Sequence, residues 1–256
     1  MNRADAPALS FKVLTLNTHK GFTSFNRRFV LHELREAVRA TGADVVFLQE
    51  VLGSHKHHSR RQQNWPPTPQ YEFLADTMWK EFAYGRNAVY PQGDHGNAIL
   101  SKFPILRYEN RDVSVGRREP RGLLHCVLKA PGPDIELHAI CVHFAVFESH
   151  RRRQLRMLCR FIRDEIPADA PLVVAGDFND WRVLANHTLE RGAGLKEAFV
   201  EQHGRSARTF HARWPVLRLD RIYYRNVRIV KPAVHSVQPW SHLSDHAPLS
   251  AEVVVA

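Results

Sequence analysis

Four strand-like segments follow one another in the middle of the chain, and no helical pattern separates them. They cover residues 82–89, 97–100, 123–128 and 135–142. Parallel neighbours in a sheet need long crossover connections, usually helices, so this succession argues against an all-parallel sheet. The pattern predicts an α/β fold in which two packed, mostly antiparallel β-sheets carry helices on their outer faces.

The flanking regions supply the helices and the remaining strands of this prediction. Apolar side chains at helical spacing between Val30 and Thr41, with Gly42 as a stop signal, predict one helix, and residues 149–165 predict a second. Further strands are expected at 11–16, 44–48, 172–175, 219–224, 227–234 and 249–255. Because the chain has no internal repeat or low-complexity linker, we expect a tail over residues 1–10 and a single domain over residues 11–256.

Residues 53–70 differ from the rest of the chain because they are polar and rich in proline. The segment is too long for an ordinary connection, which predicts either a functional loop or a disordered one. It contains the run His55-Lys56-His57-His58, whose spacing is loose for a separate transition-metal site and which no cysteine joins. A mobile basic loop is the simpler interpretation.

Composition favours anionic partners and a reducing compartment. The net charge of +10 suits nucleic acid, anionic lipid or any phosphate-bearing substrate, without choosing among them. No run reaches the ~20 apolar residues that cross a bilayer, and residues 1–10 lack a signal-peptide pattern. Cys126, Cys141 and Cys159 lie in apolar patterns without zinc spacing. We therefore expect a cytoplasmic protein, and no feature indicates an obligate protein partner.

Glu50 and Asn17 are the first candidates for a metal site. Glu50 follows the buried run of residues 45–48, so its carboxylate must face solvent or a cation. Magnesium prefers hard oxygen ligands and usually takes one or two protein carboxylates, and Asn17 offers an amide oxygen at the end of another strand. A solvated acid at a strand end remains the alternative for Glu50 taken alone.

Asp177 and Asn179 flank Phe178 at the end of the apolar run 172–175. Gly176 allows the chain to turn sharply, and Phe178 is expected to point inward, which leaves both polar side chains on one side. An acid can orient or deprotonate a water molecule, and an amide can donate to a phosphoryl oxygen. An Asx turn at a strand end explains the same residues equally well.

The segment Ser244-Asp245-His246 precedes the last strand and offers an acid beside an imidazole. Adjacent side chains point in different directions, so one can serve a metal while the other contacts a phosphate. An imidazole with an unperturbed pKa of ~6.5 can act as a cation or as a proton carrier. Asp220 could orient such an imidazole, and His143 ends the strand 135–142, where a structural role is the alternative.

Together these motifs resemble the endonuclease/exonuclease/phosphatase superfamily. The resemblance rests on Leu16-Asn17, Leu48-Gln49-Glu50, Gly96-Asn97-Ala98-Ile99-Leu100-Ser101, Val142-His143, Gly176-Asp177-Phe178-Asn179, Leu219-Asp220-Arg221-Ile222 and Ser244-Asp245-His246. It spans about Phe11 to Val255 and is similar to an uncharacterised bacterial branch, which suggests no substrate. It implies a four-layer α/β sandwich of the DNase I-like type and hydrolysis of a phosphodiester or phosphomonoester with a divalent metal.

The resemblance also implies roles around the metal and the attacking water. Glu50 would be the principal metal ligand, helped by Asn17 and Asp245. The usual ion is Mg²⁺, and Mn²⁺ could replace it. Asp177 would position and activate the water, and Asn179 would contact that water or the phosphate.

Further residues would address the phosphate in the same scheme. His246, paired with Asp220, would stabilise charge on the phosphoryl group, and His143 would bind the phosphate or assist the leaving group. Arg121 would contact the phosphate from its position just before the strand expected at residues 123–128. Asn97 would contact the substrate or support the site.

The identity of the phosphate ester stays open. The net charge and two arginine clusters, Arg117-Arg118-Arg121 and the run from Arg151 to Arg163, favour a nuclease-like phosphodiesterase, although a solvated helix flank also explains the second cluster. Trp65, Trp214 and Trp240 in expected loops leave a phospholipid-headgroup hydrolase open, with core packing as the alternative for at least two of them. A small soluble phosphate ester is a third choice. A phosphate-recognising interaction module predicts an eroded site, whereas every motif residue is present.

Overall fold

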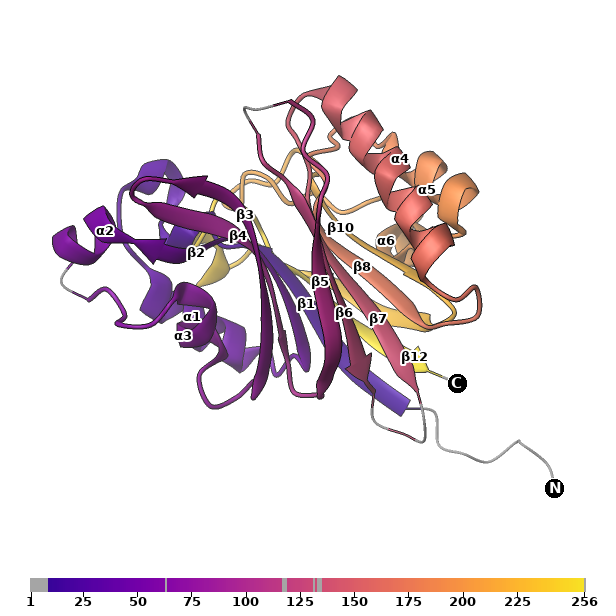
Figure 1. Cartoon of the computed structure of the whole chain (residues 1–256), viewed down its shortest axis with the longest axis horizontal. Helices are drawn as coiled ribbons and strands as arrows, with labels where there is room; N and C mark the ends of the chain where they lie inside the picture. Colours follow the sequence, from indigo (N-terminus) through magenta and orange to yellow (C-terminus); the bar gives the residue numbers. More distant parts are fainter. Residues whose placement is uncertain (1–8, 63, 117–118, 131, 133–134, 256) are drawn as a thin grey trace.

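Two six-stranded β-sheets packed face to face form the centre of the computed structural model, which describes residues 9–62, 64–116, 119–130, 132 and 135–255 (Figure 1). The first sheet contains β1 (Leu9–Asn17), β2 (Val45–His55), β3 (Glu81–Tyr90), β4 (Gly93–Ser101), β11 (Arg228–Val234) and β12 (Leu249–Val255). The second contains β5 (Ile105–Asp112), β6 (Gly122–Lys129), β7 (Glu136–His143), β8 (Leu172–Asp177), β9 (Lys196–Glu197) and β10 (Asp220–Arg225).

Each sheet is mixed but mostly antiparallel. The strand orders are β11-β12-β1-β2-β4-β3 and β5-β6-β7-β8-β10-β9. One pair in each sheet is parallel, β1 with β2 and β7 with β8, and the other described neighbours are antiparallel. The predicted pair of mostly antiparallel sheets is confirmed.

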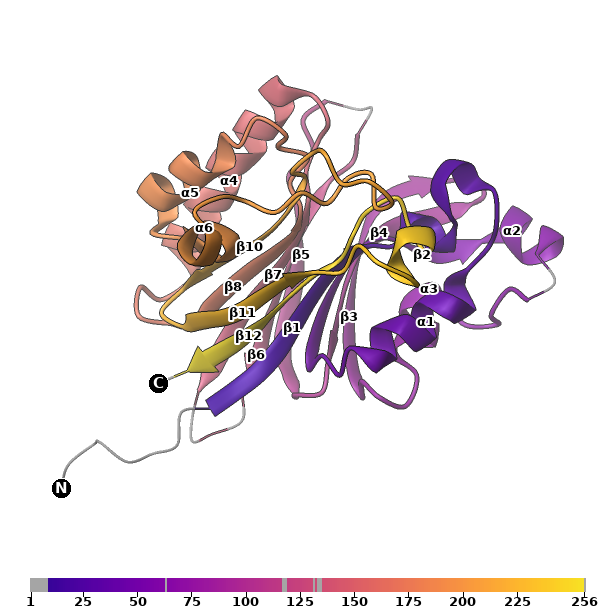
Figure 2. The ribbon, with the colours of Figure 1, turned by 180° about the vertical axis from the view of Figure 1, so that it is seen from behind.

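Helices cover the outer face of each sheet and complete four layers (Figures 1 and 2). On the outer face of the first sheet lie α1 (Leu31–Ala40) and α3 (Gln70–Ala75), and on that of the second lie α4 (Glu148–Glu165) and α5 (Ala185–Ala193). Helix α2 (Lys56–Arg61) directly follows β2, and α6 (Ala198–His203) packs at the edge of the core between the sheets, against β10 and β11. The short 3-10 helices η1 (His19–Gly21), η2 (Ser24–Asn26) and η3 (Trp240–His242) lie in loops. This is the DNase I-like α/β sandwich expected from the motifs.

The period of two along each strand explains why both faces of the sheets are buried. In β1, Val13 belongs to the core between the sheets, whereas its neighbour Leu14 packs in the cluster formed with α1 and α3. In β7, Val142 packs with Leu158 of α4 on the opposite side of the molecule. Burying each such aliphatic side chain stabilises the fold by about 1.5–3 kcal/mol, so three apolar layers hold the four layers of backbone together.

Some elements carry no sequence pattern that predicts them. β5 is an edge strand that pairs only with β6 among the described strands, and Arg107, Tyr108 and Arg111 along it are exposed. An edge strand with both faces solvated shows no apolar period, which is why it escapes prediction. The two-residue strand β9 and the short helices α5 and α6 are likewise unpredicted.

Two predicted boundaries are wrong, and part of a predicted loop forms regular structure. β1 starts at Leu9 and pairs there with Val255, so the last two residues of the expected tail 1–10 belong to the sheet; residues 1–8 lie outside the described part. β2 does not end at Glu50 but continues to His55. Most of segment 53–70 is therefore ordered as the end of β2, α2 and the start of α3, because apolar Val51 and Leu52 prolong the pairing with β4. The side chain of His58 lies outside the described residues.

Cysteines and tryptophans are placed largely as expected. Cys126, Cys141 and Cys159 are buried free thiols. Trp240 is buried beside α1, and Trp65 stacks on Phe29 with ring centroids 5.0 Å apart, whereas Trp214 is 70% exposed.

Among the described helices, none combines the length and apolar character needed to span a membrane.

The topology brings the polar motifs to one end of the sandwich. β1 ends at Asn17, which pairs with Gln49 inside the parallel strand β2, and parallel β7 and β8 end together at His143 and Asp177. β10 runs antiparallel to β8, so its first residue, Asp220, lies directly opposite the last residue of β8, Asp177. Strand ends distant in sequence therefore meet where the two sheets face each other.

Gly176 is required for the turn that presents Asp177. Its φ of +146° is rarely adopted by residues with a side chain, and a Cβ atom there would lie 2.0 Å from the carbonyl oxygen of Val142. We expect Gly176→Ala to lower the free energy of unfolding by about 3 kcal/mol or more, because backbone strain and overpacking add. Urea unfolding would measure the loss.

A matched control is available at Gly204. That glycine also has a positive φ, +71°, but no atom lies within 4 Å of the position of an added Cβ. Gly204→Ala should lower the free energy of unfolding by only about 1 kcal/mol. Equal losses in the two variants would show that the close approach of β8 to β7 does not need glycine.

Candidate active site

Asp177, at the end of β8, is contacted by side chains from several strand ends. Its Oδ2 accepts a hydrogen bond from Nδ2 of Asn17 at 3.2 Å and lies 3.5 Å from Nε2 of His143 and 3.8 Å from Nε2 of His246. Its Oδ1 accepts the backbone N–H of Asn179 at 2.8 Å. One fully buried carboxylate therefore meets two imidazoles and an amide.

His246 and Asp220 form a buried acid–imidazole pair next to Asp177. Nδ1 of His246 lies 2.9 Å from Oδ2 of Asp220, and Oγ1 of Thr209 accepts the Asp220 backbone N–H. Although burial acts to lower it, the carboxylates of Asp220 and Asp177 raise the pKa of His246 to about 10. Burial raises the pKa of Asp177 to about 6, against the attraction of His246. His246 is thus a cation held between two acids.

His143, unlike His246, carries a neutral imidazole. Burial, helped by the positive charges of Arg121 and His246, lowers the pKa of His143 well below its usual value. The neutral ring carries one N–H donor and one acceptor nitrogen. Asp177 is therefore contacted by one neutral and one cationic imidazole, which offer different proton chemistry at the same carboxylate.

Glu50 lies in a β-bulge. The register between β2 and β4 shifts just before Val51, and Glu50 has φ of +54°, an uncommon value for a residue with a side chain. Its Oε1 accepts a long 3.4 Å hydrogen bond from Nδ2 of Asn17. Burial opposes ionisation, but the nearby charges of Lys20 and His19 lower the pKa of Glu50. The bulge therefore presents an ionised carboxylate at the strand end of β1.

Asn17 connects the acids of the two sheets. Its Nδ2 donates both to Glu50 and to Asp177, and its Oδ1 accepts the backbone N–H of His19 at 3.0 Å. The backbone oxygen of Asn17 accepts from Oγ of Ser244 at 2.7 Å, which holds the segment before β12 against β1. Asn17 thus positions two carboxylates, and its amide oxygen keeps a second lone pair for a further partner.

Asp245 approaches the same region from the loop before β12. Its Oδ1 lies 3.3 Å from Nδ1 of His19 and accepts a 3.4 Å hydrogen bond from Oγ of Ser244. Its side chain is only 18% exposed. Its backbone oxygen accepts the N–H of Ala212, which joins the loop before β10 to the site.

Asn179 and Phe178 fix the chain after Asp177. Asn179 has a φ of +50°, and its Nδ2 donates to the backbone oxygen of Phe144 at 2.9 Å. The ring of Phe178 is buried edge-on between Phe144 and Tyr223, with centroids 5.3 and 5.0 Å away. The expected inward aromatic is confirmed, and the amide of Asn179 ties the loop after β7 to the loop after β8.

Asn97 and Arg121 lie less directly at the site. Nδ2 of Asn97 donates to the backbone oxygens of Gly122 and Cys141, so this amide links the first sheet to the second. Arg121 is near enough to lower the pKa of His143, and its guanidinium lies 3.8 Å from Glu119. Both side chains are at most partly exposed, and no described hydrogen bond connects either to the acids of the site.

The arginines of the second predicted cluster, along α4, are mostly exposed to solvent. Arg117 and Arg118 lie outside the described residues. Along α4, Arg152, Arg156, Arg160 and Arg163 are exposed, which confirms a solvated helix flank. Arg151 is instead buried, and its Nη1 donates to the backbone oxygens that follow β7.

Three basic side chains of the site were not among the residues expected there: His19, Lys20 and His95. His19 and Lys20 follow Asn17 directly, in a strained turn where both have positive φ. The carbonyl of Lys20 is held by Nε2 of Gln70 at 2.9 Å. Burial and the charge of Lys20 lower the pKa of His95 to about 4, so that ring is neutral. The polar run Thr18-His19-Lys20 ending at Gly21 is the signal that could have revealed this turn.

The donor chemistry fits a hard divalent cation at Glu50. Among the described hydrogen bonds only the long one from Asn17 reaches this ionised carboxylate, which leaves oxygen lone pairs available. Among the described residues, Asp177, Asp220 and His246 also bring ligand atoms within 4.8 Å of one another. A protonated imidazole cannot ligate a metal, so Glu50 is the better primary ligand for an oxygen-seeking ion.

The match to a known family identifies a hydrolase of phosphate esters. The chain belongs to the endonuclease/exonuclease/phosphatase family, whose model matches residues 14–246. It is 58% identical over 244 residues to the uncharacterized protein YbhP of Escherichia coli strain K12, covering 95% of this chain and 96% of the relative.

Solved structures share the fold at lower identity. Mannosyl-6-phosphatase Bt3783 of Bacteroides thetaiotaomicron superposes with a TM-score of 0.74 at 17% identity, over 95% of this chain and 99% of that one. TDP2 of D. rerio, solved with a single-strand DNA product, superposes with a TM-score of 0.70 at 18% identity, over 95% and 98% of the two chains. Both likenesses establish the DNase I-like sandwich.

Proposed function

We propose that the protein is a divalent-metal-dependent phosphodiesterase that uses water as the nucleophile. The observation that carries this proposal is the arrangement around Asp177. One carboxylate oxygen contacts Asn17, a neutral His143 and a cationic His246, and Asn17 extends the array to ionised Glu50. Such a set supports water activation and stabilisation of a phosphoryl group within a few ångströms.

In the proposed mechanism, Glu50 would hold the cation, with Asn17 and Asp245 beside it. Mg²⁺ is the ion that carboxylate and amide oxygens suit best, and Mn²⁺ could replace it. When bound, such an ion neutralises charge on the phosphoryl oxygens. The ionised state of Glu50 and the small number of its hydrogen bonds support this assignment.

The remaining side chains would act on the water and the phosphate. Asp177 would orient the attacking water and accept its proton, and Asn179 would contact the water or the phosphate. His246, kept cationic and oriented by Asp220, would donate from Nε2 to a phosphoryl oxygen. His143 would donate its single N–H to the phosphate or to the leaving oxygen.

A diester is the substrate class we favour. The same fold occurs in a mannosyl-6-phosphatase and in a protein solved with a DNA product, so the fold does not select the ester. The net charge of +10 and a cavity of about 610 Å³ beside the site support a substrate with a second substituent on phosphorus.

The proposal includes a cytoplasmic location, supported by three buried free thiols.

A phospholipid headgroup is the second candidate, because Trp214 is 70% exposed and lines the same cavity. Interfacial enzymes place such rings at the membrane surface.

Paired chromogenic substrates test the preference for diesters. With Mg²⁺ present, we expect kcat/KM for bis-p-nitrophenyl phosphate to exceed that for p-nitrophenyl phosphate, since the proposed site accepts a substituent on each side of the phosphate. Turnover of the monoester alone would contradict the phosphodiesterase assignment and identify a phosphatase. Asp177→Asn, assayed in parallel, identifies any contaminating activity.

A further inference from the structure

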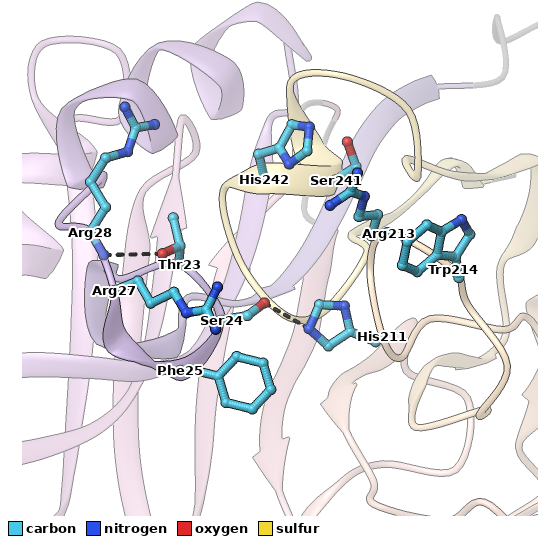
Figure 3. A pocket seen from close by; sticks show the side chains of 10 residues that line it. All are labelled: Thr23, Ser24, Phe25, Arg27, Arg28, His211, Arg213, Trp214, Ser241 and His242. Atoms are coloured by element: carbon cyan, nitrogen blue, oxygen red, sulfur yellow. Dashed lines mark hydrogen bonds between the residues drawn. The ribbon is translucent and has the colours of Figure 1, made fainter.

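A groove beside the active site is lined by aromatic rings and arginines from two loops that are far apart in sequence (Figure 3). Phe25, Arg27 and Arg28 come from the segment after β1, and His211, Arg213 and Trp214 come from the segment before β10. We call this the arginine–aromatic groove. Its volume is about 610 Å³.

The groove adjoins the proposed reaction centre. Oγ of Ser24 lies 2.7 Å from Nε2 of His211, which joins the two loops across the groove (Figure 3). The next residue, Ala212, donates its backbone N–H to the backbone oxygen of Asp245. The ring of Phe210 lies 5.1 Å from that of His246. A chain leaving the phosphate site on this side would therefore enter the groove.

The two large rings of the groove are open to solvent. Phe25 is 80% exposed and Trp214 is 70% exposed. Exposed apolar side chains that line a binding groove together often mark an interaction site. In the view of Figure 3 the two rings lie on either side of the His211 ring, so they offer separate planar surfaces.

Each ring has a guanidinium beside it. Cζ of Arg27 lies 5.4 Å from the centroid of Phe25, and Cζ of Arg213 lies 4.7 Å from the centroid of Trp214. Among the described ion pairs, neither Arg27 nor Arg213 has a carboxylate partner, whereas Arg28 lies 3.6 Å from exposed Glu33. Two uncompensated positive charges therefore accompany two exposed rings.

We propose that the arginine–aromatic groove binds a single-stranded polynucleotide, whose bases stack on Phe25 and Trp214 while its phosphates meet Arg27 and Arg213. This inference deepens the proposed function and rests on it, because the bound strand would carry the scissile phosphodiester. A surface that alternates planar rings and cations matches a ligand that alternates bases and phosphates. A duplex keeps its bases stacked inside and cannot offer them to the rings.

A membrane surface fits the groove less well. Interfacial binding depends on an apolar face that enters the lipid as a continuous surface. Here the rings line a concavity, alternate with arginines and histidines, and come from loops rather than from an amphipathic helix. Binding of anionic lipid is the alternative, and the experiment includes lipid vesicles to detect it.

Fluorescence anisotropy with a labelled single-stranded oligothymidylate tests the proposal on the whole chain in EDTA, where no hydrolysis interferes. Because stacking on an aromatic ring contributes 1–3 kcal/mol per base, we expect Phe25→Ala and Trp214→Ala each to weaken binding by about 5- to 150-fold. Trp214→Phe should restore most of the affinity. Arg27→Gln and Arg213→Gln should each reduce the slope of log K against log salt by about 0.7.

Matched controls come from exposed residues elsewhere. Tyr108 is 58% exposed on β5 and Arg191 is exposed on α5, so Tyr108→Ala and Arg191→Gln should leave affinity and salt slope unchanged. Oligonucleotide affinity that is equal in the wild type, Phe25→Ala and Trp214→Ala would overturn the proposal. The proposal would also be overturned if binding to vesicles of phosphatidylserine and phosphatidylcholine depended on Phe25 and Trp214 while binding to the oligonucleotide did not.

Hydrolysis of bis-p-nitrophenyl phosphate by the wild type separates this inference from the proposed function. Small-diester turnover without groove-dependent oligonucleotide binding would reject the groove and leave the phosphodiesterase standing. Groove-dependent binding without turnover of any diester would reject the phosphodiesterase and, with it, the role of the groove in holding a substrate.

Discussion

Asp177→Asn is expected to lower the turnover of a phosphodiester by about 10²–10⁴-fold, the range that a positioned general base contributes. The substitution preserves the shape of a fully buried side chain while removing the charge that His246 and Asn17 face. It also removes the acceptor for the proton of the attacking water. The loss should appear in kcat, since the substrate would still meet His143 and His246.

The fold and metal binding should survive this substitution. The amide oxygen of the substituted side chain can still accept the backbone N–H that Asp177 accepts now, and Glu50 is untouched. Asp164→Asn is the control, because it makes the same change on the exposed face of α4. Turnover within a few fold of the wild type would remove Asp177 from the role of activating water.

Glu50→Gln is expected to abolish metal-dependent turnover by another route, the loss of the cation. Glutamine keeps the size of the side chain but removes the charge that a divalent ion needs. We expect a loss of at least about 10²–10³-fold in kcat, the scale for removing a preorganised electrostatic group. Metal affinity should fall as well, and that change is measurable without any substrate.

Thermal unfolding with added Mg²⁺ distinguishes the two variants. A ligand that binds the native state raises the midpoint of unfolding according to its concentration relative to Kd. The wild type and Asp177→Asn should gain stability with Mg²⁺, whereas Glu50→Gln should not. Glu190→Gln, at an exposed position of α5, controls for the removal of a glutamate charge. A Mg²⁺ response in Glu50→Gln equal to that of the wild type would assign the cation to other ligands.

The strand ends of the site are largely predictable from sequence. An apolar run that stops at a polar residue marks the place where a buried strand leaves the core, and Asp177 and His143 end β8 and β7 as expected. The expected pairing of Asp220 with His246 appears as a 2.9 Å contact. These features follow from local pattern and from motif order, both of which the sequence carries.

The fine placement of the site depends on long-range backbone pairing, which the sequence does not express locally. Glu50 is presented by a bulge inside β2, not by the end of a strand, because Val51 and Leu52 resume pairing with β4. Lys20 reaches the site through a left-handed turn held by Gln70, fifty residues away. Contacts of this kind have no period that a sequence pattern can reveal.

The protonation states of the imidazoles are also invisible in the sequence. His143 ends β7 and His246 lies in the segment before β12, yet burial makes the first imidazole neutral and two carboxylates make the second cationic. The difference depends on Asp220 lying opposite Asp177 across β8 and β10. Only the assembled sheet brings two acids to one imidazole.

The most direct test of the central claim is the metal dependence of diester hydrolysis. The protein is treated with EDTA, dialysed, and assayed on bis-p-nitrophenyl phosphate while Mg²⁺ is added back, with Asp177→Asn and Glu50→Gln alongside. If the protein is a metal-dependent phosphodiesterase built on these residues, the wild type should be inactive in EDTA and regain activity when Mg²⁺ is added. Both variants should remain at least about 10²-fold less active than the wild type. Hydrolysis that persists in EDTA and is equal in all three proteins would contradict the account.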